Sequence, residues 1–549
     1  MGGRYHVKIG EQGFLLKPGS YRRRAVTLNP ELRTQNSEPG WRWWQQSDWR
    51  GGDGQRVAGN GKTGGWDDGA RWRSGYGVEV GEPGRVELGP ALKLSFLSSE
   101  EGFAAMLAFH GKQYALPTSS GKIYSYDGSG WTVDWDSGKG SMRSLIRHRD
   151  RLYAGSGSDG TVFAGDGLGW STAFQIVGTA SIASMASYEV WDPVAKATVP
   201  RLFMGCQFPD EEARIYLWDG TAATEIHGCR ETGIETMAVY RGQLYVATSE
   251  TGNGVQGRVL CFDGRSGSGE WAEVAAFSDN YVAGWTIFDN LLFCGSGVGG
   301  KVWAFDGDRL VEAYSLSAPG LEYMEPLRAL GVCGGRLYVG YSHPTQGMAL
   351  LCKLPEAGIG DRGLESDSSA SRSLAPGPQA GWFTPCTTGV AATPWAMAIY
   401  GGQLYLAGKA PGVAPIYQRD QSSHQNSGLL ESSFFDGGQP TVAKLLRSLT
   451  LVHDKLLAGQ YLEAKFALEG SDSFQQIESF DDLAGCDRGL TTADWRPGDG
   501  LVRLKGMPAQ RFTGKLPGDP AVPHAAYKLA SPNPNSPPAV FAEEFTATE

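Results

Sequence analysis

The string Gly242-Gln243-Leu244-Tyr245-Val246-Ala247 and its follower Val259-Leu260-Cys261-Phe262-Asp263-Gly264 decide the fold of this chain of 549 residues. The first string is short, β-branched and aromatic, and turn residues bound it, which is typical of a β-strand. The pair Arg241-Gly242 favours the positive φ angles of a two-residue hairpin. The second string closes on aromatic-Asp-Gly, where Gly tolerates positive φ and Asp bonds its own backbone. Together the strings form one cell of strands and tight turns.

The same cell recurs along the chain, and a repeat sets the architecture. Six clear copies begin at His110, Arg151, Arg201, Gly242, Asn290 and Gly335, and two weaker copies begin at Gly402 and Asp454. A cell of roughly 40–50 residues with about four strands fits one blade of a β-propeller. The sequence therefore predicts an all-β fold with a propeller of seven or eight blades. A β-solenoid is the strongest alternative, but its cells are usually shorter.

The repeat divides the chain into three predicted regions. Residues 96–485 form the propeller, and the Ser-, Gly- and Pro-rich stretch 355–390 forms an insertion loop between blades. Residues 1–95 lack the repeat and form an N-terminal arm with short strands. Residues 486–549 form an extended, Pro-rich C-terminal segment. We expect a strand from one of the two termini to pair with the first blade, since closure of the ring removes exposed sheet edges.

The composition limits the class of protein. Gly accounts for 78 residues, but an apolar fraction of 41% and an aromatic fraction of 11% exclude a disordered low-complexity chain. The net charge of −10 gives no general attraction to nucleic acid. The sequence shows neither an apolar run of membrane-spanning length nor a signal-peptide pattern. We therefore expect synthesis in a cytoplasm, either followed by residence there or by release without a secretion signal, for example by lysis.

Chemistry-bearing residues are scattered. The eight cysteines contain no Cys-x-x-Cys pair, and we expect buried, reduced thiols. The eight histidines form no ligand pattern and the Asp-Gly pairs are interpreted as turns, so we predict neither metal nor cofactor. The string Gly59-Asn60-Gly61-Lys62-Thr63 lacks the flanking strand and helix of a phosphate-binding loop. No nucleophile motif occurs, and we predict no catalytic residues and no enzymatic activity.

Six of the 17 tryptophans lie in the short stretch from Trp41 to Trp72. So many Trp in a Gly-rich segment cannot form a core alone and must pack on the propeller or on another chain. Trp and Arg carry much of the binding energy at protein interfaces. The predicted partner-binding residues are Trp41, Trp43, Trp44, Trp49, Arg50 and Gln55. The alternative is that they fasten the arm to the rim of the chain's own propeller.

The stretch from Trp41 to Gln55, with its Trp49-Arg50-Gly51-Gly52-Asp53-Gly54-Gln55 element, resembles N-terminal segments of tail-associated proteins of tailed bacteriophages. In that group a similar element precedes a β-propeller with Leu-Tyr and aromatic-Asp-Gly repeats. The resemblance covers residues 10–95 by motif and 100–470 by architecture. It implies a structural protein of the virion tail, at its tip or fibres, that is made in the host bacterial cytoplasm. The arm would dock to other tail proteins in multiple copies, and the propeller would serve host attachment or assembly.

Two other functions also agree with the sequence. A glycan-binding, lectin-like propeller would stack exposed Trp and Tyr of its loops on sugar rings, and it is compatible with a phage protein that binds host surface sugar. A polysaccharide-degrading propeller would need carboxylates that converge from several blades, which one sequence cannot show. The fold alone does not choose among these classes.

Overall fold

The computed structural model describes the side chains of residues 49–53, 72, 74–82, 85–179, 181–209, 211–250, 256–264, 270–316, 323–355 and 381–431, together with strand pairing in further segments. Every regular element in this described part is a β-strand. No helix within it is long and apolar enough to cross a membrane. The chain divides into two compact units, residues 92–352 with 387–420 and residues 1–91 with 353–386 and 421–549. We call them the propeller unit and the terminal unit.

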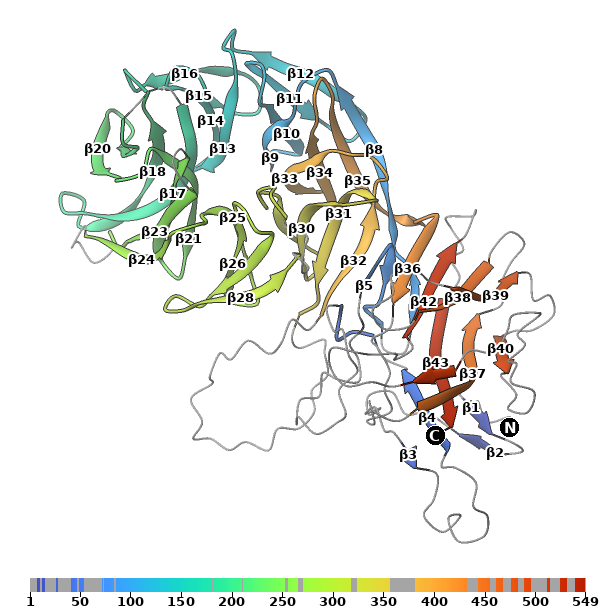
Figure 1. Ribbon diagram of the computed structural model, residues 1–549. Helices are drawn as coiled ribbons and strands as arrows, with labels where there is room; N and C mark the ends of the chain where they lie inside the picture. Colours follow the sequence, from blue (N-terminus) through green and yellow to red (C-terminus); the bar gives the residue numbers. More distant parts are fainter. Residues whose placement is uncertain are drawn as a thin grey trace. The chain divides into compact units, whose positions relative to one another are not determined.

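Seven four-stranded sheets stand around a common centre as the blades of a β-propeller, which confirms the predicted fold class (Figure 1). The first strand of each blade contacts the first strand of the next, and β33 contacts β9 to complete the ring. These innermost strands are β9 (Phe103–Phe109), β13 (Met142–His148), β17 (Ser181–Asp192), β21 (Gly233–Tyr240), β25 (Val282–Phe288), β29 (Leu330–Cys333) and β33 (Thr393–Tyr400). The ring therefore has seven members, the lower of the two predicted numbers.

The predicted Leu-Tyr strands are the second strands of the blades. They are β10 (Lys112–Pro117), β14 (Arg151–Ser156), β18 (Ala197–Gln207), β22 (Gln243–Thr251), β26 (Leu291–Ser296), β30 (Arg336–His343) and β34 (Gln403–Lys409). The third strands, most of which end at or near aromatic-Asp-Gly, are β11 (Lys122–Tyr126), β15 (Thr161–Gly165), β19 (Arg214–Trp218), β23 (Val255–Phe262), β27 (Lys301–Phe305), β31 (Gly347–Lys353) and β35 (Ala414–His424). One copy of the repeat thus builds the middle of one blade.

The fourth strands form the outer edge of the blades. They are β12 (Trp131–Asp136), β16 (Trp170–Gln175), β20 (Ala223–Gly228), β24 (Trp271–Phe277), β28 (Leu310–Ser315) and β32 (Trp382–Thr387), and the seventh blade takes β8 (Pro90–Ser98) instead. Since β8 precedes the first blade in the sequence, the chain closes its own ring from the N-terminal side. Closure by a terminal strand is confirmed, but its partner is β35 of the last blade and not the predicted first blade, whose four strands β9 to β12 all follow β8 in the chain.

The hairpins between first and second strands have the predicted geometry. Both turn residues take positive φ in five blades, at His110-Gly111, Arg241-Gly242, Asp289-Asn290, Gly334-Gly335 and Gly401-Gly402. Turns of this kind match the twist of the flanking strands. In these five blades the repeat therefore fixes the register of the inner hairpin through its turn chemistry.

In the Asp-Gly turns after the third strands, the Asp side chain accepts hydrogen bonds from the backbone of its own turn. Asp219 Oδ1 accepts hydrogen bonds from the backbone N–H groups of Thr221 at 2.7 Å and Ala222 at 2.8 Å, and Gly220 has a φ of 109°. Equivalent bonds reach Asp127, Asp166 and Asp306. The backbone bonds from Ala222 and Thr221 lower the pKa of Asp219 to about 2. These aspartates serve turns, and the described residues contain no group of acids and histidines that could hold a metal ion.

Neighbouring blades meet where the second strand has a small residue. A Cβ atom at Gly205 would lie 2.6 Å from Cγ2 of Ile234, and one at Gly295 would lie 2.1 Å from the carbonyl oxygen of Leu327, both in the following blade. Glycine therefore allows the close approach of blades that buries Phe203 and Leu244 in one shared apolar cluster. The described cysteines are buried and form no disulfide, as expected: Cys206, Cys229, Cys261, Cys294, Cys333, Cys352 and Cys386.

The terminal unit contains strands from both ends of the chain. One sheet has the order β39 (Gln475–Asp481), β38 (Tyr461–Ala467), β42 (His524–Ala530), β36 (Ser427–Glu431) and β5 (Ser74–Tyr76). A second has the order β3 (Val26–Thr27), β4 (Trp41–Gln46), β43 (Ala539–Thr548), β37 (Ala443–Asp454) and β40 (Arg488–Asp494), with β41 (Arg511–Thr513), β6 (Val78–Glu79) and β7 (Val86–Leu88) attached. The strands β1 (Val7–Ile9) and β2 (Gln12–Phe14) form a hairpin.

Two predicted boundaries differ from the structure. The propeller does not extend to residue 485, because β36 to β39 belong to the terminal unit and the eighth copy of the repeat builds no blade. Part of the predicted insertion 355–390 is β32, the outer strand of the sixth blade, and residues 356–380 lie outside the described part. The C-terminal segment, predicted to be extended, contributes β41, β42 and β43, which pair within this chain.

Candidate functional site

The first strands of the blades carry β-bulges beside the centre of the ring. In β21 the pairing register shifts between Ile234 and Thr236, which leaves Glu235 as the extra residue. The same shift leaves Ala104, Arg143, Ala183, Ala283 and Trp395 unpaired in five other blades. In the sixth blade Arg328 has the equivalent place, directly before Ala329, whose carbonyl accepts the N–H of Gly340 at 2.8 Å. We call these seven residues the bulge ring; bulges re-aim side chains and are common beside functional sites.

A four-residue sequence pattern produces each bulge. It reads apolar, variable, small, apolar, and it occurs at Phe103–Met106, Met142–Leu145, Ile182–Met185, Ile234–Met237, Val282–Trp285, Leu327–Leu330 and Pro394–Met397. The small third residue lets adjacent first strands approach; a Cβ at Gly284, for example, would lie 2.6 Å from the carbonyl oxygen of Arg328. The variable second residue is the bulge-ring member. The repeat thus fixes the backbone and leaves one side chain per blade free to differ.

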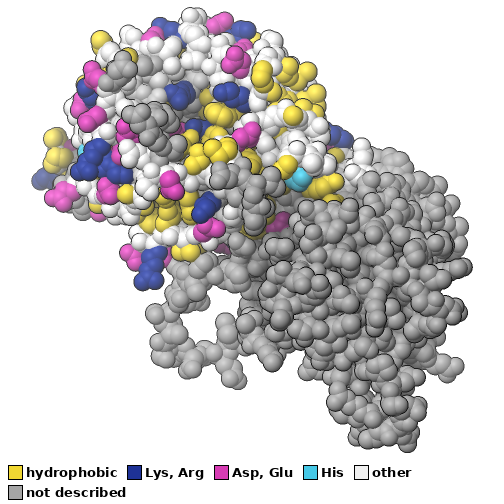
Figure 2. Space-filling view, viewed as in Figure 1, with side chains coloured by type: hydrophobic (Ala, Val, Ile, Leu, Met, Phe, Trp, Pro, Cys, Tyr) yellow, Lys and Arg dark blue, Asp and Glu magenta, His cyan; other side chains and the backbone are white. Residues whose placement is uncertain are grey.

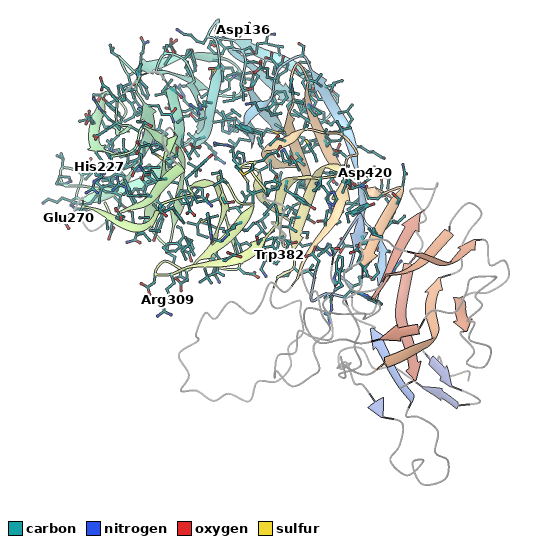
Figure 3. The ribbon with its side chains drawn as sticks, viewed as in Figure 1. Asp136, His227, Glu270, Arg309, Trp382 and Asp420 are labelled. Carbon is teal, nitrogen blue, oxygen red and sulfur yellow. The ribbon has the colours of Figure 1, made fainter. Side chains whose placement is uncertain are left out.

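The bulge ring surrounds a cavity of about 300 Å³ in the propeller unit. All seven members line it, together with the neighbouring Ala105, Ser144, Leu145, Ile146, Ser184, Met185, Ile234, Thr236, Met237, Gly284 and Trp285. This volume lies at the lower end of the range of small-molecule sites. In Figure 3 the labelled Asp136, Glu270 and Arg309 lie at the outer edge of the blades, away from this centre. The cavity is therefore a place where side chains from every blade converge.

An ion pair spans two members of the ring. Arg328 Nη2 lies 2.7 Å from Glu235 Oε2, and Ser249 Oγ donates a hydrogen bond of 2.6 Å to Glu235 Oε1. Burial alone would raise the pKa of Glu235, but the charge of Arg328 and these hydrogen bonds lower it below its usual value. Glu235 is therefore ionised at neutral pH. Ala283, which lies between the two in the ring, leaves room for this pair.

Arg143 is the second cation of the ring. Its Nη1 donates to Gln207 Oε1 at 2.6 Å and to Ser181 Oγ at 3.2 Å, both in the neighbouring blade. Within the described part of the chain, its Nε and Nη2 have no hydrogen-bond partner. The side chain is open to water in the cavity but has protein on most sides. This partial burial lowers the pKa of Arg143, Glu235 opposes the shift and Arg328 adds to it.

Two tryptophans complete the polar lining. Trp395 lies between cations, with Arg328 Cζ 4.9 Å and Lys409 Nζ 4.6 Å from its ring centre. Cations over an aromatic face are attracted by its quadrupole. Among the described residues, the buried Nε1–H of Trp285 and the buried Nε–H of Arg328 lack a hydrogen-bond partner. These two donors have no accessible surface, so what the tryptophans bring to the cavity wall is the aromatic surface of Trp285 and Trp395.

The bulge ring has a net positive charge. Two arginines and one glutamate give +1, whereas the whole chain has a net charge of −10. On the described face in Figure 2, basic and acidic side chains are interspersed, with no large area of one sign. The positive charge is thus a local property of the cavity. A cavity of this kind is able to bind a small anion by hydrogen bonds and charge.

The predicted partner-binding residues lie outside the cavity, in the terminal unit. Trp49 is 1% exposed, and its carbonyl accepts the Nε1–H of the fully buried Trp72 at 3.1 Å. Asp53 N–H donates to the carbonyl of Trp382 at 2.8 Å, which fixes this segment inside the unit. Trp49 therefore packs within its own chain and offers no surface to a partner here.

The other members of the predicted set have different positions. Arg50 is half-buried, and Trp41, Trp43 and Trp44 belong to β4, which pairs with β43. Gln55 lies outside the described residues. For these five residues, partner binding stays a prediction. The cavity residues Arg143, Glu235, Arg328 and Trp395 were missed by sequence reasoning, although the four-residue bulge pattern would have marked them.

Comparisons with known proteins assign the chain to no family. No protein-family model and no curated protein matches the chain. Two similar solved structures are extracellular domains of a putative hybrid two-component system and of a putative one-component system, both from B. thetaiotaomicron. Each is 14% identical to this chain; they cover 75% and 76% of it with TM-scores of 0.40 and 0.38. The chain spans 48% of the length of either structure.

Proposed function

We propose that this chain is a non-enzymatic attachment protein of a bacteriophage tail, at the tip or the fibres. The terminal unit docks it to other tail proteins in multiple copies, and the propeller contacts the host surface. The motif Trp49 to Gln55 before a propeller supports the tail assignment. The observation that carries the attachment role is the cavity, where one variable side chain from each blade converges.

The cavity favours binding over hydrolysis. Glycoside hydrolysis commonly uses two carboxylates that flank the scissile bond, about 5–9.5 Å apart. Among the described residues that line the cavity, Glu235 is the sole carboxylate, and Arg328 holds it in an ion pair. An ionised, paired carboxylate is a poor proton donor. These facts support a protein that recognises a ligand without cleaving it.

The test is immunogold labelling of intact particles from the source, with an antibody raised against the purified protein. Label confined to the tail end is the expected result. If no particle carries the label, the tail assignment is refuted, whatever the propeller binds.

A glycan-binding, lectin-like propeller outside any virion is the second candidate. The specific observation in its favour is the pair Trp285 and Trp395 in the cavity wall, since aromatic rings are common in sugar-binding sites. Binding of soluble glycan by a protein absent from particles would favour this candidate. Both candidates bind their ligand in the same cavity. They differ only in whether the protein is part of a virion.

A further inference from the structure

We infer that the bulge ring binds the carboxylate of an acidic sugar, with Arg143 and Arg328 as its recognition groups. This inference deepens the proposed function, because it gives the class of ligand for the propeller. It rests on three observations about the cavity: its free donors, its net charge and its aromatic wall.

The free donors point to an anion. Arg143 lines the cavity and uses only Nη1 for its printed hydrogen bonds, so Nε and Nη2 have no partner within the described part of the chain. A guanidinium presents its donors in a fixed fork that matches a carboxylate. Arg328, the other cation of the lining, has its Nη2 in the ion pair with Glu235.

The net charge selects a singly charged ligand. The ring has a charge of +1, which one carboxylate neutralises. A phosphate monoester carries about −1.5 to −2 at neutral pH and would leave negative charge unbalanced beside Glu235. Glu235, whose carboxylate is partly satisfied by Arg328 and Ser249, is able to accept a further hydrogen bond from a sugar hydroxyl.

The aromatic wall and the volume select a sugar over an inorganic anion. Trp285 and Trp395 supply apolar surface, and Thr236 and Ser144 belong to the same lining. A cavity of about 300 Å³ is far larger than an inorganic anion needs and agrees with one small organic ligand. The combination of two cations, hydroxyls and Trp rings fits a hexuronate.

The repeat supplies a substitution that preserves the fold. Three members of the ring are already alanine, namely Ala104, Ala183 and Ala283, so alanine is accepted at this position of a blade. Arg143→Ala removes the free donors without leaving a buried partner charge. Arg147→Ala is the matched control, since Arg147 is an exposed residue of the same strand outside the cavity lining. A double variant, Glu235→Ala with Arg328→Ala, removes both members of the ion pair together.

The experiment is isothermal titration of the full chain with glucuronate, glucose and inorganic phosphate. We expect glucuronate to bind and glucose to bind at least tenfold more weakly. Arg143→Ala and the double variant should each weaken glucuronate binding by roughly 10–100-fold, the usual effect of a lost charged hydrogen bond. Arg147→Ala should bind as the wild type does, and circular dichroism should show all variants folded.

Several results would overturn the inference. These are glucuronate binding no tighter than glucose, phosphate binding more tightly than glucuronate, or equal losses in Arg143→Ala and Arg147→Ala. A hyaluronate tetrasaccharide, tested beside the monosaccharide, separates a surface polysaccharide from a free sugar acid, and binding of either supports the inference. Tail labelling without uronate binding refutes only this inference, whereas uronate binding without tail labelling refutes only the virion role.

Discussion

The seventh and eighth copies of the repeat resemble each other in sequence, but only the seventh builds a blade. The seventh begins with Gly401-Gly402, whose φ angles of 57° and 75° form a tight hairpin, and it buries Leu404 and Tyr405. At the matching sequence positions the eighth has His453-Asp454, which are the last residues of strand β37, and Leu457 in place of the aromatic residue. Before it, β37 pairs with β40, β41 and β43 in the terminal unit. An apolar strand string alone therefore does not make a blade; the turn, the aromatic residue and the partner strands are also needed.

The largest expected effect concerns the aromatic position that distinguishes the copies. Phe203 is fully buried between blades, and Phe203→Ala should lower the free energy of unfolding by about 3–5 kcal/mol, since a large cavity remains. Leu457→Ala, at the same position of the eighth copy, should lower the free energy of unfolding of the propeller by less than half as much. Urea unfolding monitored by near-ultraviolet circular dichroism measures both. Equal losses would show that the eighth copy supports the propeller as a blade does.

Much of the propeller was predictable because each copy carries its own signals. The hairpin pairs such as Arg241-Gly242 take the predicted positive φ, and the Asp-Gly turns hold as expected. The boundary at 485 was not predictable, because the pairing of β37 with β43 joins segments far apart in the chain. The bulge pattern marks Arg143, Glu235 and Arg328 one by one, but the sequence does not show that these residues of three blades line one cavity or that Glu235 and Arg328 form an ion pair.

The second prediction tests the small residue at the contact between blades. A Cβ at Gly295 would lie 2.1 Å from the carbonyl oxygen of Leu327, so Gly295→Val forces the two blades apart. We expect the free energy of unfolding to fall by about 1–3 kcal/mol or more, the usual cost of overpacking. Gly140→Ala is the control, since nothing lies within 4 Å of its Cβ position, and it should change stability by about 0.5 kcal/mol or less. A tolerated Gly295→Val would contradict close packing of the blades.

Gly459 extends this test to the eighth copy. It has the sequence position that Gly155 has in the second blade. Since the eighth copy builds no blade, Gly459→Val should leave the urea midpoint of the propeller unchanged. A loss as large as that of Gly295→Val would mean that residue 459 meets a neighbouring blade.

The third prediction uses the pH dependence of one blade. His148 is 5% exposed, and burial, together with the charges of Arg149 and Arg201, lowers its pKa to about 4. The unfolded chain, with an ordinary histidine pKa near 6.5, binds a proton before the folded chain does. The free energy of unfolding should therefore fall as the pH decreases from about 6.5 to about 4.

The matching variant is His148→Gln, which keeps a polar group beside Ser187, the partner of His148 Nδ1 at 2.8 Å. Its stability should depend less on pH over the same interval, and the two profiles should differ in slope there. Parallel profiles would show that His148 does not contribute to the acid sensitivity.

The smallest expected effect concerns the Asp-Gly turn, which the eighth copy lacks. Asp219 is exposed, and it stabilises the turn by accepting hydrogen bonds from the backbone N–H groups of Thr221 and Ala222. Because these bonds lower its pKa to about 2, their stabilisation is present above about pH 4 and is lost as the pH falls toward 2. Asp219→Ala should lower the melting temperature slightly at pH 7, and the difference from the wild type should shrink as the pH falls toward 2.

The control is Glu270→Ala, which removes an exposed carboxylate at the outer edge of a blade and should show no such difference at either pH (Figure 3). An undiminished difference at pH 2 would assign the effect of Asp219 to backbone propensity and not to its charge.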